Sequence, residues 1–260
     1  MKVLNTIKAI LYEYVLPLFI VPKCVSCFSV IPSDKDALCD KCKRIYEIES
    51  KLSCSVCHRP HPYCSCRVEF EEISIPLFHV TGYDIKREAI SKNIVLHIKE
   101  NYYPTAFDSI ADQMAEVLNR RFPMISSSML SDLVITWVPR SKRAKRKAGH
   151  DQSLELAKRL AKTFECEFLE LFENNSDTYQ KTLGKEQRHE NAKKNYALIE
   201  DAVAAIGDRY VVLIDDIVTT GASVGACAKL LLDANVKNVL ALVYAKTDSH
   251  RSVDEEAFAI

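Results

Sequence analysis

Apolar runs of strand length alternate with segments of helical periodicity from residue 73 onward. Strands are predicted over 75–83, 133–138, 166–172, 210–214 and 239–244. Helices are predicted over 104–122, 154–164 and 222–234, and around Ile90, Ile94 and Ile98, which recur at four-residue intervals. Residues 174–196 are polar and lack periodicity, so a long loop is expected there. Strands that alternate with helices predict an α/β domain around a mainly parallel sheet.

The composition changes sharply near residue 70 and divides the chain into three parts. Residues 71–260 carry the α/β pattern. Residues 21–70 are rich in Cys, Pro, Ser and Lys and lack a periodicity long enough for a conventional core, so something other than burial is expected to hold them. Residues 1–20 predict an amphipathic helix that docks on the rest of the protein. Their longest apolar run, 15–22, is too short to span a bilayer, and a helix on a membrane surface is the alternative.

The overall composition is that of a folded globular protein. Of the 260 residues, 48% are hydrophobic and 27% are charged, which argues against disorder. Lysine plus arginine equals aspartate plus glutamate at 35 each, so net charge does not indicate a nucleic-acid partner and only local clustering could. With neither a signal peptide nor a transmembrane segment in the pattern, we expect a cytoplasmic protein.

Eight of the ten cysteines are clustered between residues 24 and 66, in four closely spaced pairs. In a reducing compartment such pairs are more typical of zinc ligands than of disulfides. The predicted metal ligands are Cys24, Cys27, Cys39, Cys42, Cys54, Cys57, Cys64 and Cys66. They predict one or two structural zinc ions, with sequential or interleaved pairing both open, and His58 or His61 could replace Cys66. The other two, Cys166 and Cys227, are predicted core residues.

The segment 211–223 carries the most chemistry. An apolar strand ends in Asp215 and Asp216, and the chain then turns into a helix that begins near Ala222. Ligands of open α/β sheets bind at the carboxyl ends of strands, where a helix N-terminus offers N–H groups to a phosphate. Hydroxyl and glycine residues suited to that role follow the carboxylates: Thr219, Thr220, Gly221 and Ser223. The paired carboxylates suit the vicinal hydroxyls of a sugar, so the segment predicts a sugar-phosphate site.

A basic stretch follows the strand that ends at Pro139. Its six cationic residues are Arg140, Lys142, Arg143, Lys145, Arg146 and Lys147. They could neutralise a diphosphate or track a nucleic-acid backbone, and a solvated charge run is the third alternative. Aromatic residues for stacking bases are sparse nearby, with Tyr179 and Tyr196 as candidates.

The strand, Asp-Asp, Thr-Thr-Gly and Ser string resembles the 5-phosphoribosyl-1-pyrophosphate (PRPP) signature of type I phosphoribosyltransferases. Together with the cysteine-rich module it resembles the ComF family of bacterial competence proteins over essentially the whole chain. Two further stretches are similar to that family. One holds Val138, Pro139, Arg140, Arg143, Arg146 and Gly149 to Gln152, and the other holds Gln180, Leu183, Arg188, Asn191 and Tyr196. The sequence departs from the family at His150 and Asp151, where Phe-Asn is usual.

The resemblance implies a type I phosphoribosyltransferase-like fold preceded by a zinc-binding module. By resemblance, Asp215 and Asp216 bind the ribose hydroxyls, Pro139 and Arg140 face the pyrophosphate, and magnesium arrives with the ligand. The whole implied PRPP loop is Asp215, Asp216, Ile217, Val218, Thr219, Thr220, Gly221, Ala222 and Ser223. If the chain is catalytic, Asp215, Asp216 and Arg140 are the implied catalytic residues.

Three functions are consistent with these features. The resemblance favours a competence protein that binds PRPP and single-stranded DNA during DNA uptake, with proteins of the competence machinery as possible partners. A phosphoribosyltransferase that moves ribose 5-phosphate to a nitrogen base is the first alternative. A structural adaptor is the second.

Overall fold

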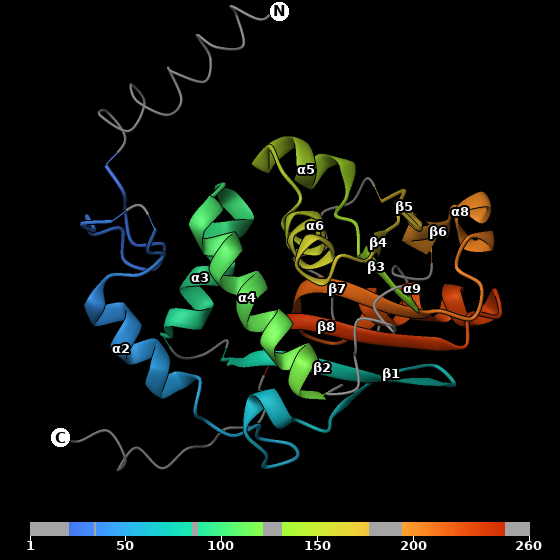
Figure 1. The fold of residues 1–260 in the computed structure, drawn as a ribbon, viewed down its shortest axis with the longest axis horizontal. Coiled ribbons are helices and arrows are strands. Elements are labelled where there is room, and N and C mark those ends of the chain that lie inside the picture. Colours follow the sequence, from blue (N-terminus) through green and yellow to red (C-terminus); the bar gives the residue numbers. More distant parts are fainter. Residues whose placement is uncertain (1–20, 34, 85–87, 122–131, 177–193, 248–260) are drawn as a thin grey trace, which may run out of the picture.

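The computed structural model describes residues 21–33, 35–84, 88–121, 132–176 and 194–247 (Figure 1). The predicted helix over 1–20 and most of the predicted loop over 174–196 lie outside these ranges. The helices are α2 (Asp40–Glu49), the 3-10 helix η3 (His61–Tyr63), α3 (Ile90–Glu100), α4 (Pro104–Arg121), α5 (Lys142–Ala148), α6 (Gln152–Phe164), α8 (Glu200–Ala204) and α9 (Ala222–Asp233). The strands are β1 (Arg67–Phe70), β2 (Ile73–Tyr83), β3 (Leu133–Trp137), β4 (Glu167–Phe168), β5 (Phe172–Asn174), β6 (Tyr196–Leu198), β7 (Tyr210–Val218) and β8 (Asn238–Thr247).

The main sheet has six strands in the order β1-β2-β8-β7-β3-β4. All of its neighbouring strands run parallel except β1, which lies antiparallel to β2 at one edge. A separate antiparallel pair is formed by β5 and β6. The chain is therefore a mixed α/β protein with a mostly parallel central sheet, as the alternating pattern predicts.

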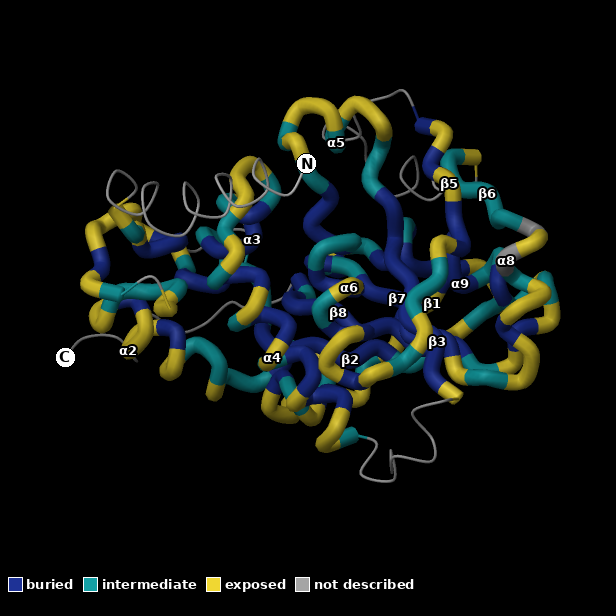
Figure 2. Tube along the Cα trace, turned by 45° about the horizontal axis from the view of Figure 1, so that its top comes forward, coloured by how far each residue is buried: buried dark blue, intermediate teal, exposed yellow. Residues whose placement is uncertain are grey.

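The central strands are buried on both faces, which explains their continuous apolar runs. In β7, Val212 and Ile214 belong to the core cluster that contains residues of α3, α4 and α6. Val211 and Leu213 belong to a second cluster, shared with α9, because successive side chains of a strand point to opposite faces. Figure 1 shows α4 passing in front of β8 and β2, with α6 above β7. Figure 2 shows buried residues throughout the sheet and exposed ones along α5.

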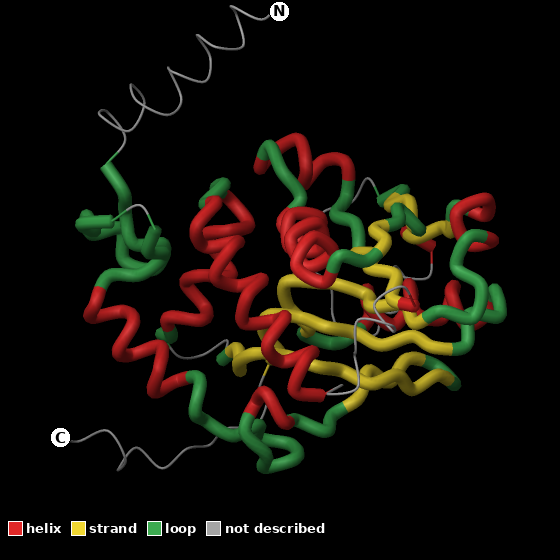
Figure 3. Tube along the Cα trace, in the orientation of Figure 1, coloured by secondary structure: helices red, strands yellow, loops and turns green. Residues whose placement is uncertain are grey.

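The cysteine-rich region contains the helix α2, which the sequence analysis did not predict (Figure 3). The expectation that burial plays no part in holding this region is wrong. Val25, Ile31 and Tyr46 are buried in the same cluster as α3 and α4. Tyr46 also donates a hydrogen bond of 2.6 Å to Gln113 Oε1 of α4. The sequence shows no apolar periodicity here because the buried residues are single apolar side chains far apart in the segment. They pack on the core of the larger domain and do not form a core of their own.

Glu49 at the end of α2 fixes this region to the start of α3. Its carboxylate oxygens accept hydrogen bonds from the backbone N–H groups of Ile90 and Ser91, at 2.8 and 3.1 Å. An acidic group at a helix N-terminus satisfies free N–H groups and is favoured by the helix dipole. The cap is therefore supplied by a residue 41 positions away in the chain.

Within the main sheet, the strand predicted over 166–172 is confirmed only at Glu167 and Phe168, and the rest of the prediction is wrong. The chain forms only β4 there, pairing Glu167 and Phe168 with β3, and β5 begins at Phe172. Leu171 packs in the core cluster on the α9 face, so the chain leaves the sheet edge after two paired residues. The strand predicted over 210–214 is longer than expected, because the ladder with β8 continues to Val218.

The basic stretch forms the helix α5. Ser141 caps its start, since Ser141 Oγ accepts a hydrogen bond of 3.2 Å from the N–H of Ala144. Gly149 ends it in the left-handed conformation with φ of 77°, which glycine adopts without strain. The predicted loop over 174–196 also contains structure at its ends, where Asn174 of β5 pairs with Tyr196 of β6.

Candidate functional site

The candidate site lies where β7 passes into α9. Asp215 and Asp216 are still within β7, and the short turn from Thr219 to Gly221 leads into the helix. Gly221 is the N-cap residue with φ of 79°, a conformation that glycine adopts without strain. The N–H of Ala222, the first residue of α9, donates a hydrogen bond of 3.3 Å to Thr220 Oγ1. Thr219 is exposed in the same turn. The arrangement is the one that binds anions at a helix N-terminus.

Ile217 and Val218, which the resemblance includes in the ligand loop, are strand residues. They pair with Ala245 and Lys246 of β8. Val218 is buried in the core cluster on the α9 face. The segment that faces solvent is therefore shorter than the implied loop and starts at Thr219.

The two aspartates have separate partners. Asp215 Oδ1 accepts a hydrogen bond of 2.8 Å from Ser153 Oγ and one of 2.9 Å from the N–H of Asp216. Asp216 Oδ2 lies 3.0 Å from Lys99 Nζ at the end of α3. The two carboxylates are therefore held by different helices, Asp215 by Ser153 of α6 and Asp216 by Lys99 of α3.

Burial and charge distinguish the pair further. Asp216 is only 2% exposed, whereas Asp215 is half-buried and accessible in part. Burial, together with the neighbouring Asp216 carboxylate, raises the pKa of Asp215 well above its usual range. Lys99 and Ser153 oppose that rise in the pKa. Ionisation of Asp215 therefore costs folding free energy, and a hydrogen-bond donor of a ligand would stabilise the ionised form.

Asp151 organises the segment between β3 and α6. It caps α6, since its Oδ1 accepts from the N–H of Leu154 at 3.5 Å. Its Oδ2 accepts from the backbone N–H of Arg140 at 3.1 Å and lies 3.2 Å from Lys145 Nζ. Arg140 in turn donates from Nη1 to the carbonyl oxygen of Lys99 at 3.1 Å. Arg140 is thereby placed next to Lys99, which pairs with Asp216.

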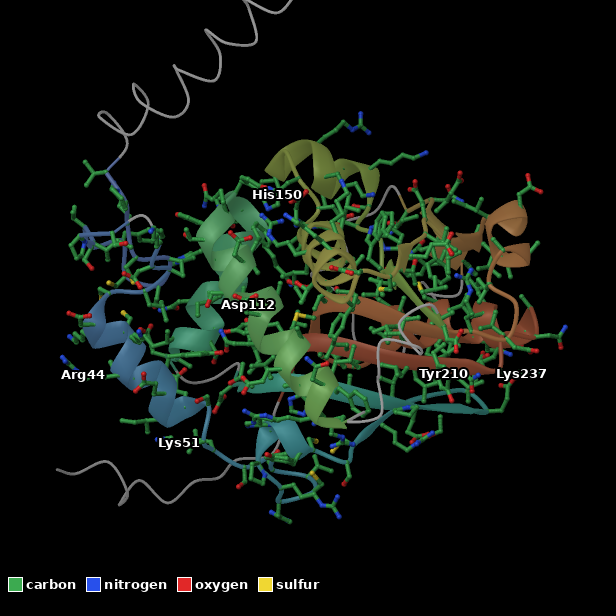
Figure 4. All side chains as sticks on the ribbon, viewed as in Figure 1. Arg44, Lys51, Asp112, His150, Tyr210 and Lys237 are labelled. Carbon is green, nitrogen blue, oxygen red and sulfur yellow. The ribbon has the colours of Figure 1, made fainter. Side chains whose placement is uncertain are left out.

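His150 and Asp151, at which the sequence departs from the resemblance, both make defined contacts in the fold. His150 lies between α5 and the end of α3, with its Nε2 2.7 Å from the carbonyl oxygen of Ile98 (Figure 4). Its ring contacts Tyr102 and Phe107, both at a centroid distance of 5.8 Å, as an aromatic residue would. Asp at position 151 caps a helix as Asn does.

Four cations of α5 face solvent, namely Lys142, Arg143, Arg146 and Lys147. Lys145 differs from them because it is half-buried and paired with Asp151. Pro139 is also turned inward: it is buried, and its carbonyl oxygen accepts a hydrogen bond of 2.7 Å from Asn174 Nδ2. Helix α5 therefore presents four exposed cationic side chains, and it begins two residues after Arg140 in the chain.

The eight predicted metal ligands gather into two groups of four. Cys24, Cys27, Cys39 and Cys42 form the first, and Cys54, Cys57, Cys64 and Cys66 form the second. Within each group all four sulfur atoms lie within 4.8 Å of one another. The pairing is sequential, and in neither group does histidine take part.

The sulfur spacing fits zinc. Tetrahedral Zn–S bonds of about 2.3 Å place thiolates about 3.8 Å apart. Cys27 and Cys39 are 3.7 Å apart at Sγ, and so are Cys54 and Cys66. Both groups could therefore hold zinc with no open position for catalysis.

Lys99, Ser153 and Glu49 were missed by the sequence analysis. Lys99 follows the buried Ile98 at the end of a helix, where a cation is ordinary. Ser153 lies in the first turn of α6, where serine is equally ordinary. Their partners are 117, 62 and 41 residues away in the chain, so no short-range signal marks them.

None of the helices in the described ranges combines the length and apolarity that crossing a membrane requires. A scan of protein-family models and a search of curated proteins found no match to this chain.

Proposed function

We propose that this chain binds PRPP or a related ribose phosphate at the turn between β7 and α9. One observation carries the proposal: a buried parallel strand with Asp215 and Asp216 near its carboxyl end turns through Gly221 into a helix N-terminus. Strand ends of this kind hold ligands in open α/β sheets. The fold class would then be that of the type I phosphoribosyltransferases.

In this proposal the phosphate binds to the N–H groups of α9 and to the hydroxyls of Thr219, Thr220 and Ser223. Asp215 accepts from a ribose hydroxyl, which replaces Ser153 Oγ as its hydrogen-bond donor. Magnesium comes with the ligand and is bound mainly by phosphate oxygens.

Lys99 and Arg140 supply the cationic side of the same site. Lys99 Nζ already faces Asp216, and Arg140 is bonded to the Lys99 carbonyl oxygen. A diphosphate between them would draw Lys99 from Asp216 and leave that carboxylate to the ligand hydroxyls or the magnesium. We therefore expect Lys99 to contribute to ligand affinity.

The proposal extends to single-stranded DNA and to a ComF-like role in DNA uptake. It is supported by the four exposed cations of α5, which suit a phosphate backbone. The helix lies in the chain between Arg140 and Asp151, and both of these residues are linked to the sugar-phosphate site. A bound strand and a bound ribose phosphate would thus be neighbours.

The direct test is calorimetric titration of PRPP with magnesium into the wild type and into a double variant with Asp215→Ala and Asp216→Ala. Micromolar binding that the double variant loses is expected. Asp208→Ala is the matched control, because Asp208 is an exposed acid before the amino end of β7. No heat of binding to the wild type rejects the sugar-phosphate site.

DNA binding is tested separately, by titrating a labelled oligonucleotide at several salt concentrations. Changing Arg143, Arg146 and Lys147 together to Gln should lower the affinity and the slope of log K against log salt, by about one unit for each lost phosphate contact. The matched control changes Lys41, Lys43 and Arg44, exposed cations on α2. Equal affinities for the wild type and the α5 variant contradict the DNA part alone.

A further inference from the structure

The second cysteine group continues directly into a strand that lies on the proposed phosphate site. Its last ligand, Cys66, is followed by β1, which begins at Arg67. Two side chains of β1 are buried, Val68 and Phe70, each 2% exposed. Val68 belongs to the core cluster of α9, and Phe70 packs with Ala222 and Ala226 of that helix. Strand β1 therefore connects the cysteine group to α9.

The contact between β1 and the site is closest at two glycines. A methyl group on Gly221 would lie 3.1 Å from Val68 Cγ1, and one on Gly225 would lie 2.4 Å from Phe70 Cβ. The second distance leaves no room for any side chain. Val68 thus holds the last residue of the proposed phosphate turn, while Phe70 holds the first turn of α9.

A second connection runs through β8. Lys246 Nζ lies 3.9 Å from Cys54 Sγ. Four thiolates around one divalent ion carry net negative charge, which a nearby ammonium group offsets. In the sheet, Lys246 is the register partner of Val218, the residue directly before Thr219. The turn therefore contacts β1 at its Gly221 end, and the residue before Thr219 pairs with β8 at its other end. Strand β1 follows the second cysteine group in the chain, and β8 contacts that group through Lys246.

We infer that a metal held by the second cysteine group sets the position of the turn from Thr219 to Gly221, with Val68 as the positioning residue. Metal occupancy and binding of the ribose phosphate are then coupled. The coupling to ligand binding rests on the proposed function. The positioning of the turn by Val68 does not depend on which ligand binds there. Coupling between two sites is reciprocal, so the ligand also retains the metal.

The first measurement is amide hydrogen exchange of residues 219–225, which needs no ligand. Val68→Ala should speed exchange there while the metal content stays that of the wild type, because the strand remains and only its contact with the turn is lost. Cys57→Ser should produce the same acceleration by removing the metal. Val239→Ala is the matched control: Val239 belongs to the same core cluster but lies near the amino end of β8.

The second measurement is calorimetric titration of PRPP with magnesium into the same variants. Val68→Ala should bind about tenfold more weakly, within the range usual for coupled sites, and Val239→Ala should bind as the wild type does. The reciprocal effect is slower release of metal to a chromogenic chelator when PRPP is present.

The outcomes separate the two proposals. No binding to the wild type, with faster exchange in Val68→Ala, rejects the ribose-phosphate ligand and upholds the positioning of the turn. Binding to the wild type with unchanged affinity and unchanged exchange in Val68→Ala overturns the inference. If Cys57→Ser fails to fold, stripping the metal from the folded wild type with a chelator replaces it, and unchanged exchange of residues 219–225 after metal removal overturns the inference.

Discussion

Lys99 Nζ lies 3.0 Å from Asp216 Oδ2, and this ion pair joins the end of α3 to the carboxyl end of β7. The Asp216 side chain is 3% exposed and that of Lys99 is 31% exposed. Lys99→Met should lower the free energy of unfolding by about 2–3 kcal/mol, since a buried carboxylate loses its cation. Chemical denaturation measures the change.

The double variant Lys99→Met with Asp216→Asn should recover most of that loss, because no unpaired charge remains. Lys237→Met serves as the control. Its partner Asp208 and Lys237 itself are both largely exposed, so no measurable change in stability is expected. A loss in the double variant as large as in Lys99→Met would show that packing, rather than charge, matters at this position.

Asp215→Asn should stabilise the ligand-free protein at neutral pH. The folded-state pKa of Asp215 is raised, chiefly by burial, so its ionised form costs folding free energy at neutral pH and its protonated form does not. Asn keeps the oxygen that accepts from Ser153. We expect a gain of about 2–4 °C in melting temperature, which corresponds to about 1 kcal/mol in a protein of this size.

The gain should shrink as the pH falls, because protonation of Asp215 removes the cost from the wild type. Melting curves of both proteins across acidic to neutral pH check this sign. A gain that stays constant with pH would mean that Asp215 is not the titrating group. The same variant should bind PRPP more weakly, so that ligand affinity and stability change in opposite directions.

Gly225→Ala should destabilise the protein although alanine is the better helix former. Helix propensity alone would favour Ala by about 1 kcal/mol. The new methyl group would meet Phe70 at 2.4 Å, and overpacking of this kind costs about 1–3 kcal/mol. The sign of the change, measured by denaturation, therefore tests the close approach of β1 to α9.

Gly149 differs from Gly225, because at Gly149 the backbone conformation, and not the space for a side chain, limits which residues are tolerated. Its φ is 77° and an added Cβ would have nothing within 4 Å. Gly149→Asn should be tolerated, since Asn adopts the left-handed conformation. Gly225→Asn should be at least as harmful as Gly225→Ala. Equal stability of the two Asn variants would contradict the packing at Gly225.

Metal analysis of the purified protein should find two zinc ions per chain, one for each cysteine group. Cys42→Ser should reduce the content to one, because a three-thiolate site binds far more weakly. Cys166→Ser is the control, since Cys166 lies outside both groups. A content of two zinc ions in Cys42→Ser would mean that the first group is not the site.

Some features could be predicted from the sequence because they depend on neighbours in the chain. The apolar run before Asp215 is one, since strand burial and the turn at Gly221 are read from adjacent residues. The cysteine spacing is another: two thiols separated by two residues can reach one ion wherever the segment folds. Both the α/β alternation and the close spacing of the eight cysteines were therefore predictable.

Other features were decided only by the tertiary structure. The sequential grouping of cysteines, the pairing of Lys99 with Asp216, and the contact of Val68 with Gly221 all join residues that are distant in the chain. Local pattern specifies which face of an element is apolar, but not which distant element covers it. A lone cation or a lone valine is energetically neutral until folding removes water from around it and brings its partner within contact distance. For this reason the sequence indicated which residue types form the candidate site, whereas only the tertiary structure showed which distant residues contact them.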